Sequence, residues 1–205
     1  MIDIFKALRE KQLLIFDFDG TVADTTPLHA AAFAQVLAPL GIPVDYSSIA
    51  GLKTIDAVQQ CLIGVGCILS DKEVGALVAA KQQCVRQMIA DALKPLPGVD
   101  EFLRWARPRY RLAMVTSGSR GTVSLALEKL CYTGWFEPLV CADDVARAKP
   151  DPEGFLKVLQ MTGVSANAAL VFEDSQAGFT AAAAAGLNFV DARLNPWQVA
   201  EGLLS

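Results

Sequence analysis

Two aspartates, Asp17 and Asp19, stand two residues apart where an apolar run that begins at Leu13 comes to an end. Residues i and i+2 of a strand that continued through them would point to the same side of a sheet. Neighbouring carboxylates repel each other and are costly to remove from water. Two explanations would account for a pair of acids held this close: both bind a divalent cation, or one is a nucleophile and the other transfers protons. A strand end followed by an acidic turn is the alternative interpretation.

Two later segments offer groups that suit a phosphate. Thr116 and Ser117 end a second apolar run, and hydroxyl and free N–H groups at a strand end can bind phosphate oxygens. Ser, Thr and Gly also build ordinary turns, so this segment alone does not establish a site. Lys149, which precedes Pro150, either screens clustered charges or extends into solvent.

A third apolar run, over residues 169–172, ends in Glu173 and Asp174. Carboxylate oxygens are hard ligands that suit magnesium. The alternative is a helix N-cap, because Asp174 or Ser175 can accept an N–H group of the helix that follows. Sites in open α/β sheets lie at the carboxyl ends of the strands, so we expect the acids, hydroxyls and lysine to meet at one edge.

The elements that must position these residues alternate between strand and helix after residue 98, and a helical stretch interrupts them after the first strand. This pattern predicts an α/β fold with a Rossmann-like doubly wound parallel sheet and an inserted helical domain. The predicted domains are 1–24 with 95–205 for the α/β core, and 25–94 for the insertion. Helices are expected at 27–40, 56–65, 70–93, 99–106, 121–130, 152–162 and 177–185, and strands at 13–18, 111–115, 139–141, 169–172 and 187–190.

The composition is that of a cytoplasmic protein. The chain has 205 residues, a net charge of −4 and scattered Lys and Arg, which argues against a nucleic-acid partner. Its five cysteines form no CxxC pair, and an odd number without a signal peptide indicates reduced thiols. No charge-free apolar run is long enough to cross a membrane, so no membrane partner is expected. The oligomeric state stays open, and a monomer is compatible with the sequence.

Over about residues 13–194, the chain resembles the haloacid dehalogenase superfamily. The resemblance rests on the ordered set Asp17-Phe18-Asp19-Gly20-Thr21, Thr116-Ser117, Lys149-Pro150 and Glu173-Asp174. Within it, the chain is most similar to the beta-phosphoglucomutase and fructose-1-phosphate phosphatase-like group. That finer match rests on Asp24-Thr25-x-Pro27-x-His29, Pro95-Leu96-Pro97-Gly98 and the segment 172–178. The resemblance implies that the helical insertion is a cap that closes over the active site.

The resemblance also implies roles for the core residues. Asp17 would be the nucleophile that forms an aspartyl-phosphate, and Asp19 would act as general acid and base. Thr116 and Ser117 would hold phosphoryl oxygens, while Lys149 would stabilise charge. The implied Mg²⁺ ligands are the carboxylate of Asp17, the backbone carbonyl of Asp19, Asp174 and, directly or indirectly, Glu173. An acid at position 19 favours phosphate chemistry over dehalogenation, because an alkoxide needs a proton to leave and a halide does not.

The cap should choose the substrate, and here the signals are weaker. The candidate substrate-binding residues, besides Ser117, are His29, Lys53, Thr54, Lys81 and Arg120. Four of them have an alternative interpretation: the histidine as a packed hinge residue, and the two lysines and the arginine as solvated side chains. Thr54 occupies the position at which mutases of the group have the arginine that binds a second phosphate.

We therefore predict a magnesium-dependent phosphatase that hydrolyses small phosphorylated metabolites, sugar phosphates foremost, through an aspartyl-phosphate. One alternative is a beta-phosphoglucomutase-like phosphomutase, which must hold a bisphosphate at both ends and which the absent arginine disfavours. Another alternative is a non-catalytic metabolite-binding protein. The acid pair, the lysine and the acids suited to bind a metal ion are all present, which argues against it.

Overall fold

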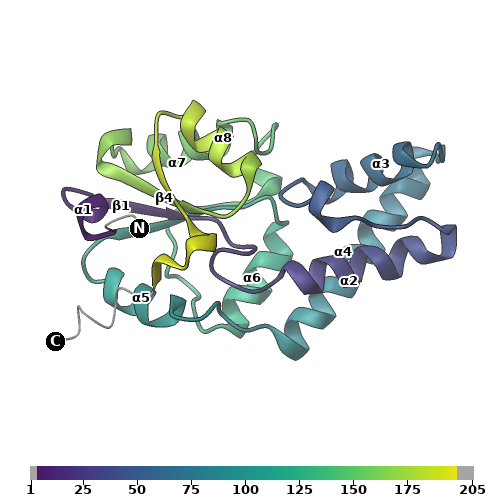
Figure 1. The fold of residues 1–205 in the computed structure, drawn as a ribbon, viewed down its shortest axis with the longest axis horizontal. Helices are drawn as coiled ribbons and strands as arrows, with labels where there is room; N and C mark the ends of the chain where they lie inside the picture. Colours follow the sequence, from purple (N-terminus) through teal and green to yellow (C-terminus); the bar gives the residue numbers. More distant parts are fainter. Residues whose placement is uncertain (1–3, 198–205) are drawn as a thin grey trace.

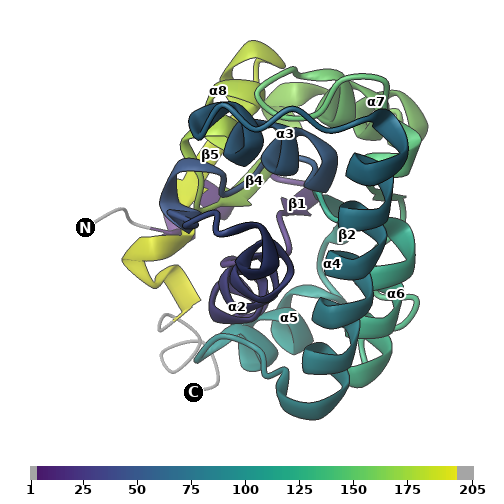
Figure 2. The ribbon, with the colours of Figure 1, turned by 90° about the vertical axis from the view of Figure 1, so that its right-hand side faces the viewer.

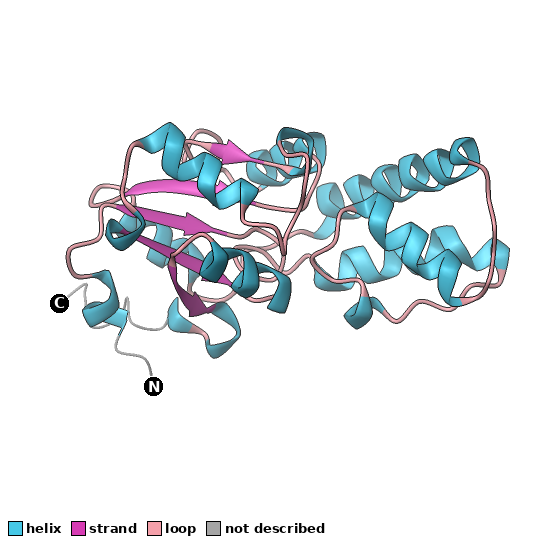
Figure 3. Ribbon diagram, turned by 90° about the horizontal axis from the view of Figure 1, so that it is seen from above, coloured by secondary structure: helices cyan, strands magenta, loops and turns pink. Residues whose placement is uncertain are grey.

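Five parallel strands form a sheet with the order β3-β2-β1-β4-β5 in this computed structural model, which describes residues 4–197. The predicted core segments 1–24 and 95–205 extend beyond them, and residues 1–3 and 198–205 lie outside the described residues. The carboxyl ends of the strands point toward the helical insertion (Figure 3). The strands are β1 (Leu13–Phe16), β2 (Arg111–Val115), β3 (Leu139–Val140), β4 (Ala169–Glu173) and β5 (Asn188–Asp191).

Helices cover both faces of this sheet, as Figure 1 shows. Side chains of β1 alternate between the two layers: Leu14 and Phe16 face one, and Leu13 and Ile15 the other. The first layer contains α1 (Ile4–Leu8), α5 (Val99–Ala106) and α6 (Arg120–Lys129), and the second contains α7 (Glu153–Thr162) and α8 (Gln176–Ala184). The predicted doubly wound α/β core is confirmed.

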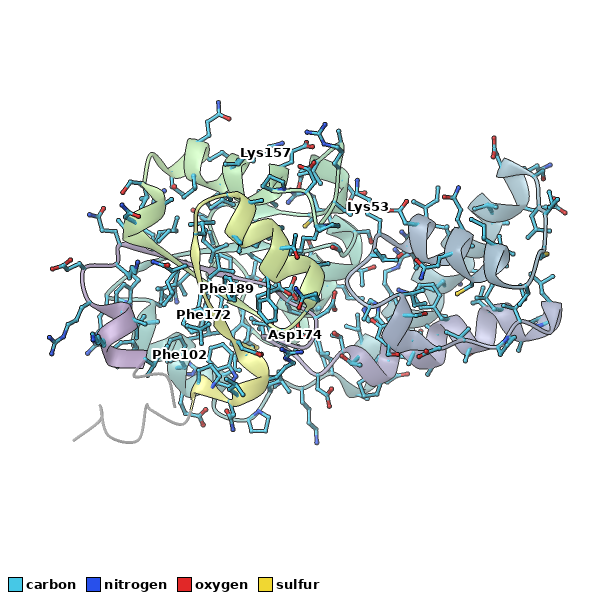
Figure 4. The ribbon with its side chains drawn as sticks, turned by 45° about the horizontal axis from the view of Figure 1, so that its top comes forward. Lys53, Phe102, Lys157, Phe172, Asp174 and Phe189 are labelled. Atoms are coloured by element: carbon cyan, nitrogen blue, oxygen red, sulfur yellow. The ribbon has the colours of Figure 1, made fainter. Side chains whose placement is uncertain are left out.

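An aromatic cluster fixes the ends of β1 and β4 relative to each other. The ring of Phe16 stacks on that of Phe172 with centroids 4.8 Å apart, and Phe172 also meets Phe102 edge-on at 5.3 Å. Figure 4 shows Phe102 and Phe172 together inside the core. Such aromatic pairs add about 0.5–1.5 kcal/mol beyond the burial of their area. The residues that directly follow these strand ends, Asp17 and Asp174, are therefore held on a rigid support.

The insertion has a hydrophobic core of its own, which includes Phe33, Leu37, Val58 and Leu62. Its elements are α2 (Thr26–Leu37), η1 (Ala38–Leu40), η2 (Tyr46–Ser48), α3 (Thr54–Gly64) and α4 (Asp71–Ala92). Figure 2 shows α4 running alongside α6 of the core, and residues of the two helices are in contact. The helical insertion predicted from the sequence is confirmed.

Local signals explain how the long helix α4 begins. Ser70 is its N-cap and accepts the N–H of Glu73, while the Glu73 carboxylate accepts the N–H of Ser70 at 2.8 Å. This reciprocal capping box satisfies donors that the first turn leaves without partners.

The segments that join the insertion to the core lie side by side. The N–H of Asp24 donates to the carbonyl of Lys94 at 3.3 Å, and the N–H of Leu96 donates to the carbonyl of Val22 at 3.0 Å. None of the helices within the described residues combines the length and the apolarity needed to span a membrane.

The first strand is shorter than predicted. It ends at Phe16 rather than at residue 18, because the carbonyl of Phe18 accepts the N–H groups of Thr21, Val22 and Ala23 and so turns the chain. The short helix α1 and the 3-10 turns were also not predicted. Asp17 and Asp19 consequently lie at a turn, and turn geometry rather than strand alternation sets their directions.

Candidate active site

Asp17, at the carboxyl end of β1, is tied to a lysine from a distant loop. The Lys149 ammonium donates to Asp17 Oδ1 at 2.6 Å and to Glu173 Oε2 at 2.7 Å. All three residues are less than a tenth exposed. Burial and the neighbouring Glu173 raise the pKa of Asp17 well above its usual value, although Lys149 opposes this. Burial lowers the pKa of Lys149, but the two carboxylates outweigh it and raise that pKa overall.

Asp174 joins this group from the end of β4. Oxygen atoms of Asp17, Glu173 and Asp174 all lie within 4.8 Å of one another. Burial, together with Glu173, raises the pKa of Asp174 to about 6. Three carboxylates against one lysine leave an excess of negative charge, and hard oxygen donors at this separation suit a divalent cation. The residues present therefore fit Mg²⁺, which the family resemblance implies.

Two glycines allow this arrangement. A Cβ atom at Gly20, whose φ is +79°, would lie 2.3 Å from Asp174 Oδ2. A Cβ atom at Gly178, in the first turn of α8, would lie 2.0 Å from Glu173 Cδ. Any larger residue at either position would displace a carboxylate of the cluster.

Glu173 differs from the other two acids because both of its oxygens are already engaged. Oε2 accepts from Lys149, while Oε1 accepts from the N–H of Asp174 at 3.2 Å, the N–H of Ser175 at 3.0 Å and the hydroxyl of Ser175 at 2.8 Å. This geometry favours Glu173 as the group that positions Lys149, and leaves Asp17 and Asp174 as the better metal ligands.

Asp19 faces residues of the insertion. The Thr25 hydroxyl donates to Asp19 Oδ1 at 2.6 Å, and His29 Nε2 lies 3.3 Å from the same oxygen. Burial raises the pKa of Asp19, but His29 and the hydrogen bonds outweigh it and lower that pKa to about 2. Lys81 Nζ, on α4, lies 2.8 Å from His29 Nδ1 and 4.5 Å from the centre of the Phe33 ring. Burial lowers the pKa of Lys81 to about 8.

The strand end after β2 contributes hydroxyl groups. Thr116 Oγ1 accepts the N–H of Gly118 at 3.0 Å, which shapes the loop. The buried Ser117 hydroxyl has no hydrogen-bond partner among the described residues and lines the same cavity as the acids. An unpartnered buried donor at this place is suited to an oxygen of a bound phosphate.

Residues of the core and of the insertion line a common cavity of about 60 Å³. The sequence-predicted residues that line it are Asp17, Asp19, His29, Thr54, Lys81, Ser117, Lys149 and Asp174. Thr116 and Glu173 are buried at the carboxyl ends of β2 and β4, and neither lines this cavity.

Lys53 and Arg120 are not brought to this cavity. The Lys53 ammonium donates to the carbonyl of Val145 at 2.8 Å, at the junction of insertion and core seen in Figure 4. The Arg120 guanidinium pairs with Asp144 and also donates to the carbonyl of Leu139. Both side chains are hydrogen-bonded to the core, and neither lines the cavity.

Sequence reasoning missed several residues that line the cavity. Most come from the insertion: Thr26, Phe33, Tyr46, Ile49 and Ala50. The loop that carries Tyr46 has no helical or strand periodicity.

The model of the haloacid dehalogenase-like hydrolase family matches residues 14–192. The chain belongs to this family. The fructose-1-phosphate phosphatase YqaB of Escherichia coli (strain K12) is 36% identical, over 88% of this chain and 96% of that protein. A phosphorylated carbohydrates phosphatase of Thermotoga maritima is 30% identical, over 86% of this chain and 82% of that protein.

A solved structure agrees with the fold of this haloacid dehalogenase-like protein. A mutant of CbbY from Rhodobacter sphaeroides, in complex with xylulose-(1,5)bisphosphate, superposes with a TM-score of 0.79 at 25% identity. The match covers 87% of this chain and 84% of that chain. This chain is a haloacid dehalogenase-like phosphatase whose helical insertion is typical of the family's cap.

Proposed function

We propose that this protein is a Mg²⁺-dependent phosphatase of small sugar phosphates that works through an aspartyl-phosphate on Asp17. One observation carries the proposal: Asp17, Lys149 and Asp174 line the same cavity as Asp19. A single phosphate in this cavity would then lie near a nucleophile, a positive charge, a carboxylate suited to bind a metal ion and a second carboxyl group that can transfer protons. The names of two relatives, a fructose-1-phosphate phosphatase and a phosphorylated carbohydrates phosphatase, support sugar phosphates as the substrate class.

In the first step, an Asp17 oxygen attacks phosphorus, and the bond between phosphorus and the sugar oxygen breaks. Lys149, 2.6 Å from Asp17, orients the nucleophile and offsets charge on the phosphoryl group. The buried Ser117 hydroxyl is placed to donate to a phosphoryl oxygen. Bound by Asp17, Asp174 and the backbone carbonyl of Asp19, Mg²⁺ would reduce the repulsion between an anionic nucleophile and an anionic substrate.

Asp19 carries the protons. It protonates the leaving sugar oxygen and then takes a proton from the water that hydrolyses the aspartyl-phosphate. Its pKa of about 2 belongs to the protein without substrate, where His29 and Thr25 stabilise the carboxylate. The negative charge of a bound phosphate raises the pKa of a neighbouring carboxyl group, which is the direction that a general acid requires.

We further propose that residues 25–94 move as one cap, with hinges near residues 24–25 and 94–97. The separate hydrophobic core of the insertion and the paired connecting segments support this. The cavity of about 60 Å³ is far smaller than the ~300 Å³ or more of ordinary small-molecule pockets, so a sugar phosphate requires the cap to open. Closure then excludes water from the reacting groups.

The experiment is a phosphate-release screen of the purified protein against sugar monophosphates, p-nitrophenyl phosphate and fructose 1,6-bisphosphate, with and without Mg²⁺. We expect Mg²⁺-dependent release from at least one sugar monophosphate, and none from the Asp17→Asn variant. Conversion of a sugar phosphate to its positional isomer without phosphate release would instead indicate a phosphomutase. Absence of both reactions from a folded, Mg²⁺-loaded protein would contradict the proposal.

A further inference from the structure

Tyr46 lines the cavity from the insertion. It lies in the turn η2, where Asp45 Oδ1 accepts the N–H of Ser47 at 3.1 Å, and Gln60 of α3 donates to the carbonyl of Ser48 at 3.1 Å. The ring of Tyr46 packs against the ring of Phe33 in a tilted arrangement, with centroids 6.2 Å apart. Both the backbone and the ring are therefore held in place before any substrate binds.

The Tyr46 hydroxyl is a free hydrogen-bonding group in this cavity. It makes no hydrogen bond within the described part of the chain, although Tyr46 is half-buried and lines the cavity. Burial and the charges of Asp19, Asp174 and Asp17 raise the pKa of Tyr46, which keeps the hydroxyl protonated and places it within the field of these carboxylates. A protonated phenol can both donate and accept.

The lysines that line the cavity are, by contrast, both hydrogen-bonded. Within residues 4–197 these cavity-lining lysines are Lys81 and Lys149. Lys81 is bonded to His29, which faces Asp19, and Lys149 is bonded to Asp17 and Glu173. The rest of the lining that the insertion provides is apolar or carries a hydroxyl, as at Leu52 and Thr54. A second phosphate would thus be desolvated there without a free cation to pair with it.

We propose that Tyr46 recognises an uncharged hydroxyl of the substrate, and that this part of the cavity selects sugar or polyol monophosphates over bisphosphates. The reacting phosphate lies against Asp17, Ser117 and Lys149, and the distal hydroxyl bonds to Tyr46 Oη while Phe33 and Leu52 pack against the carbon chain. This inference rests on the proposed phosphatase activity and adds its specificity residue.

Tyr46→Phe tests this directly, because it keeps the ring contact with Phe33 and removes only the hydroxyl. The two probe substrates are the best hexose monophosphate of the screen and hexyl phosphate, an alkyl ester that lacks the sugar hydroxyls. We expect Tyr46→Phe to lower kcat/KM for the hexose phosphate by about five- to tenfold, the value of one hydrogen bond, and that for hexyl phosphate by less than about twofold. Tyr110→Phe, on the far side of the core, is the matched control and should change neither value.

Equal effects of Tyr46→Phe on the two substrates, or no effect on either, would overturn the role of Tyr46. Hydrolysis of fructose 1,6-bisphosphate with a higher kcat/KM than that of the monophosphates would overturn the selection against a second phosphate. Hydrolysis of hexyl phosphate by the variant also reports that it is folded. A wild-type protein that hydrolyses none of these esters would remove the phosphatase proposal itself, an outcome distinct from the other two.

Discussion

The ammonium of Lys81 lies 2.8 Å from Nδ1 of His29, and this contact orients the imidazole ring. Because an ammonium group can only donate, Nδ1 accepts and the ring proton is on Nε2. Nε2 lies 3.3 Å from Asp19 Oδ1. A lysine of α4 thus orients a ring that faces a carboxylate of the core, so a displacement of α4 would change the surroundings of the proposed general acid.

Replacing Lys81 with methionine should therefore impair proton transfer more than substrate selection. The variant loses the charge-assisted hydrogen bond to His29, and we expect kcat/KM for sugar phosphates to fall about tenfold or more. p-Nitrophenyl phosphate, whose leaving group needs little protonation, should lose less. Steady-state kinetics on both substrates measure this, with Lys72→Met on the exposed surface of the same helix as the control.

Lys53→Ala should leave the ranking of the sugar phosphates by kcat/KM unchanged, because the Lys53 ammonium is hydrogen-bonded to the carbonyl of Val145 outside the cavity.

Asp17→Asn should abolish turnover without unfolding the protein, because an amide cannot serve as the attacking carboxylate. We expect phosphate release to fall by more than about a thousandfold. Asp91→Asn, an exposed change on α4, should retain full activity. Mass spectrometry of the acid-quenched wild type should detect a phosphorylated Asp17, and a folded Asp17→Asn protein with substantial activity would exclude the covalent route.

Asp19→Asn should slow the enzyme most for substrates with poor leaving groups. The variant keeps the backbone carbonyl at position 19 but has no carboxyl proton to donate. The ratio of kcat/KM for p-nitrophenyl phosphate to that for a sugar phosphate should rise, by about tenfold or more. Equal losses on both substrates would assign Asp19 a different role.

Mg²⁺ should stabilise the fold in a pH-dependent way, because its proposed ligand Asp174 has a pKa of about 6 in the folded protein against an ordinary value of 3.8. Between these values the folded state binds more protons than the unfolded state, so the contribution of Asp174 to metal-free stability falls as pH rises through this window. Deprotonated Asp174 is the form that binds a cation.

Adding Mg²⁺ should therefore raise Tm by several degrees at pH 7.5 and by much less at pH 5. Thermal unfolding followed by circular dichroism measures this without any substrate. Asp174→Asn should remove the Mg²⁺-induced shift, and Asp91→Asn should keep it. An equal shift at both pH values would argue against Asp174 as a ligand.

The sequence alone was sufficient to predict a parallel sheet and the polar residues that follow its strands. The apolar runs of β1, β2 and β4 are continuous because both faces of a parallel sheet are buried. The carboxyl ends of such strands meet at one edge, so acids that follow them converge whatever the intervening chain does. Asp17, Asp174 and Ser117 could be placed together on that ground, and Lys149 could be added from its motif.

Only the tertiary structure decided which insertion residues face the cavity and how each acid is paired. Lys53 and Tyr46 lie in loops without periodicity, where side-chain direction depends on how the insertion packs on the core. That packing bonds the Lys53 ammonium to the carbonyl of Val145 and brings Tyr46 to the cavity. The contact of Lys81 with His29 joins residues 52 positions apart in the sequence, and local sequence preferences carry no information on such a distance. The motifs therefore specify the chemistry, while the packing of the cap on the core determines the surroundings of the substrate.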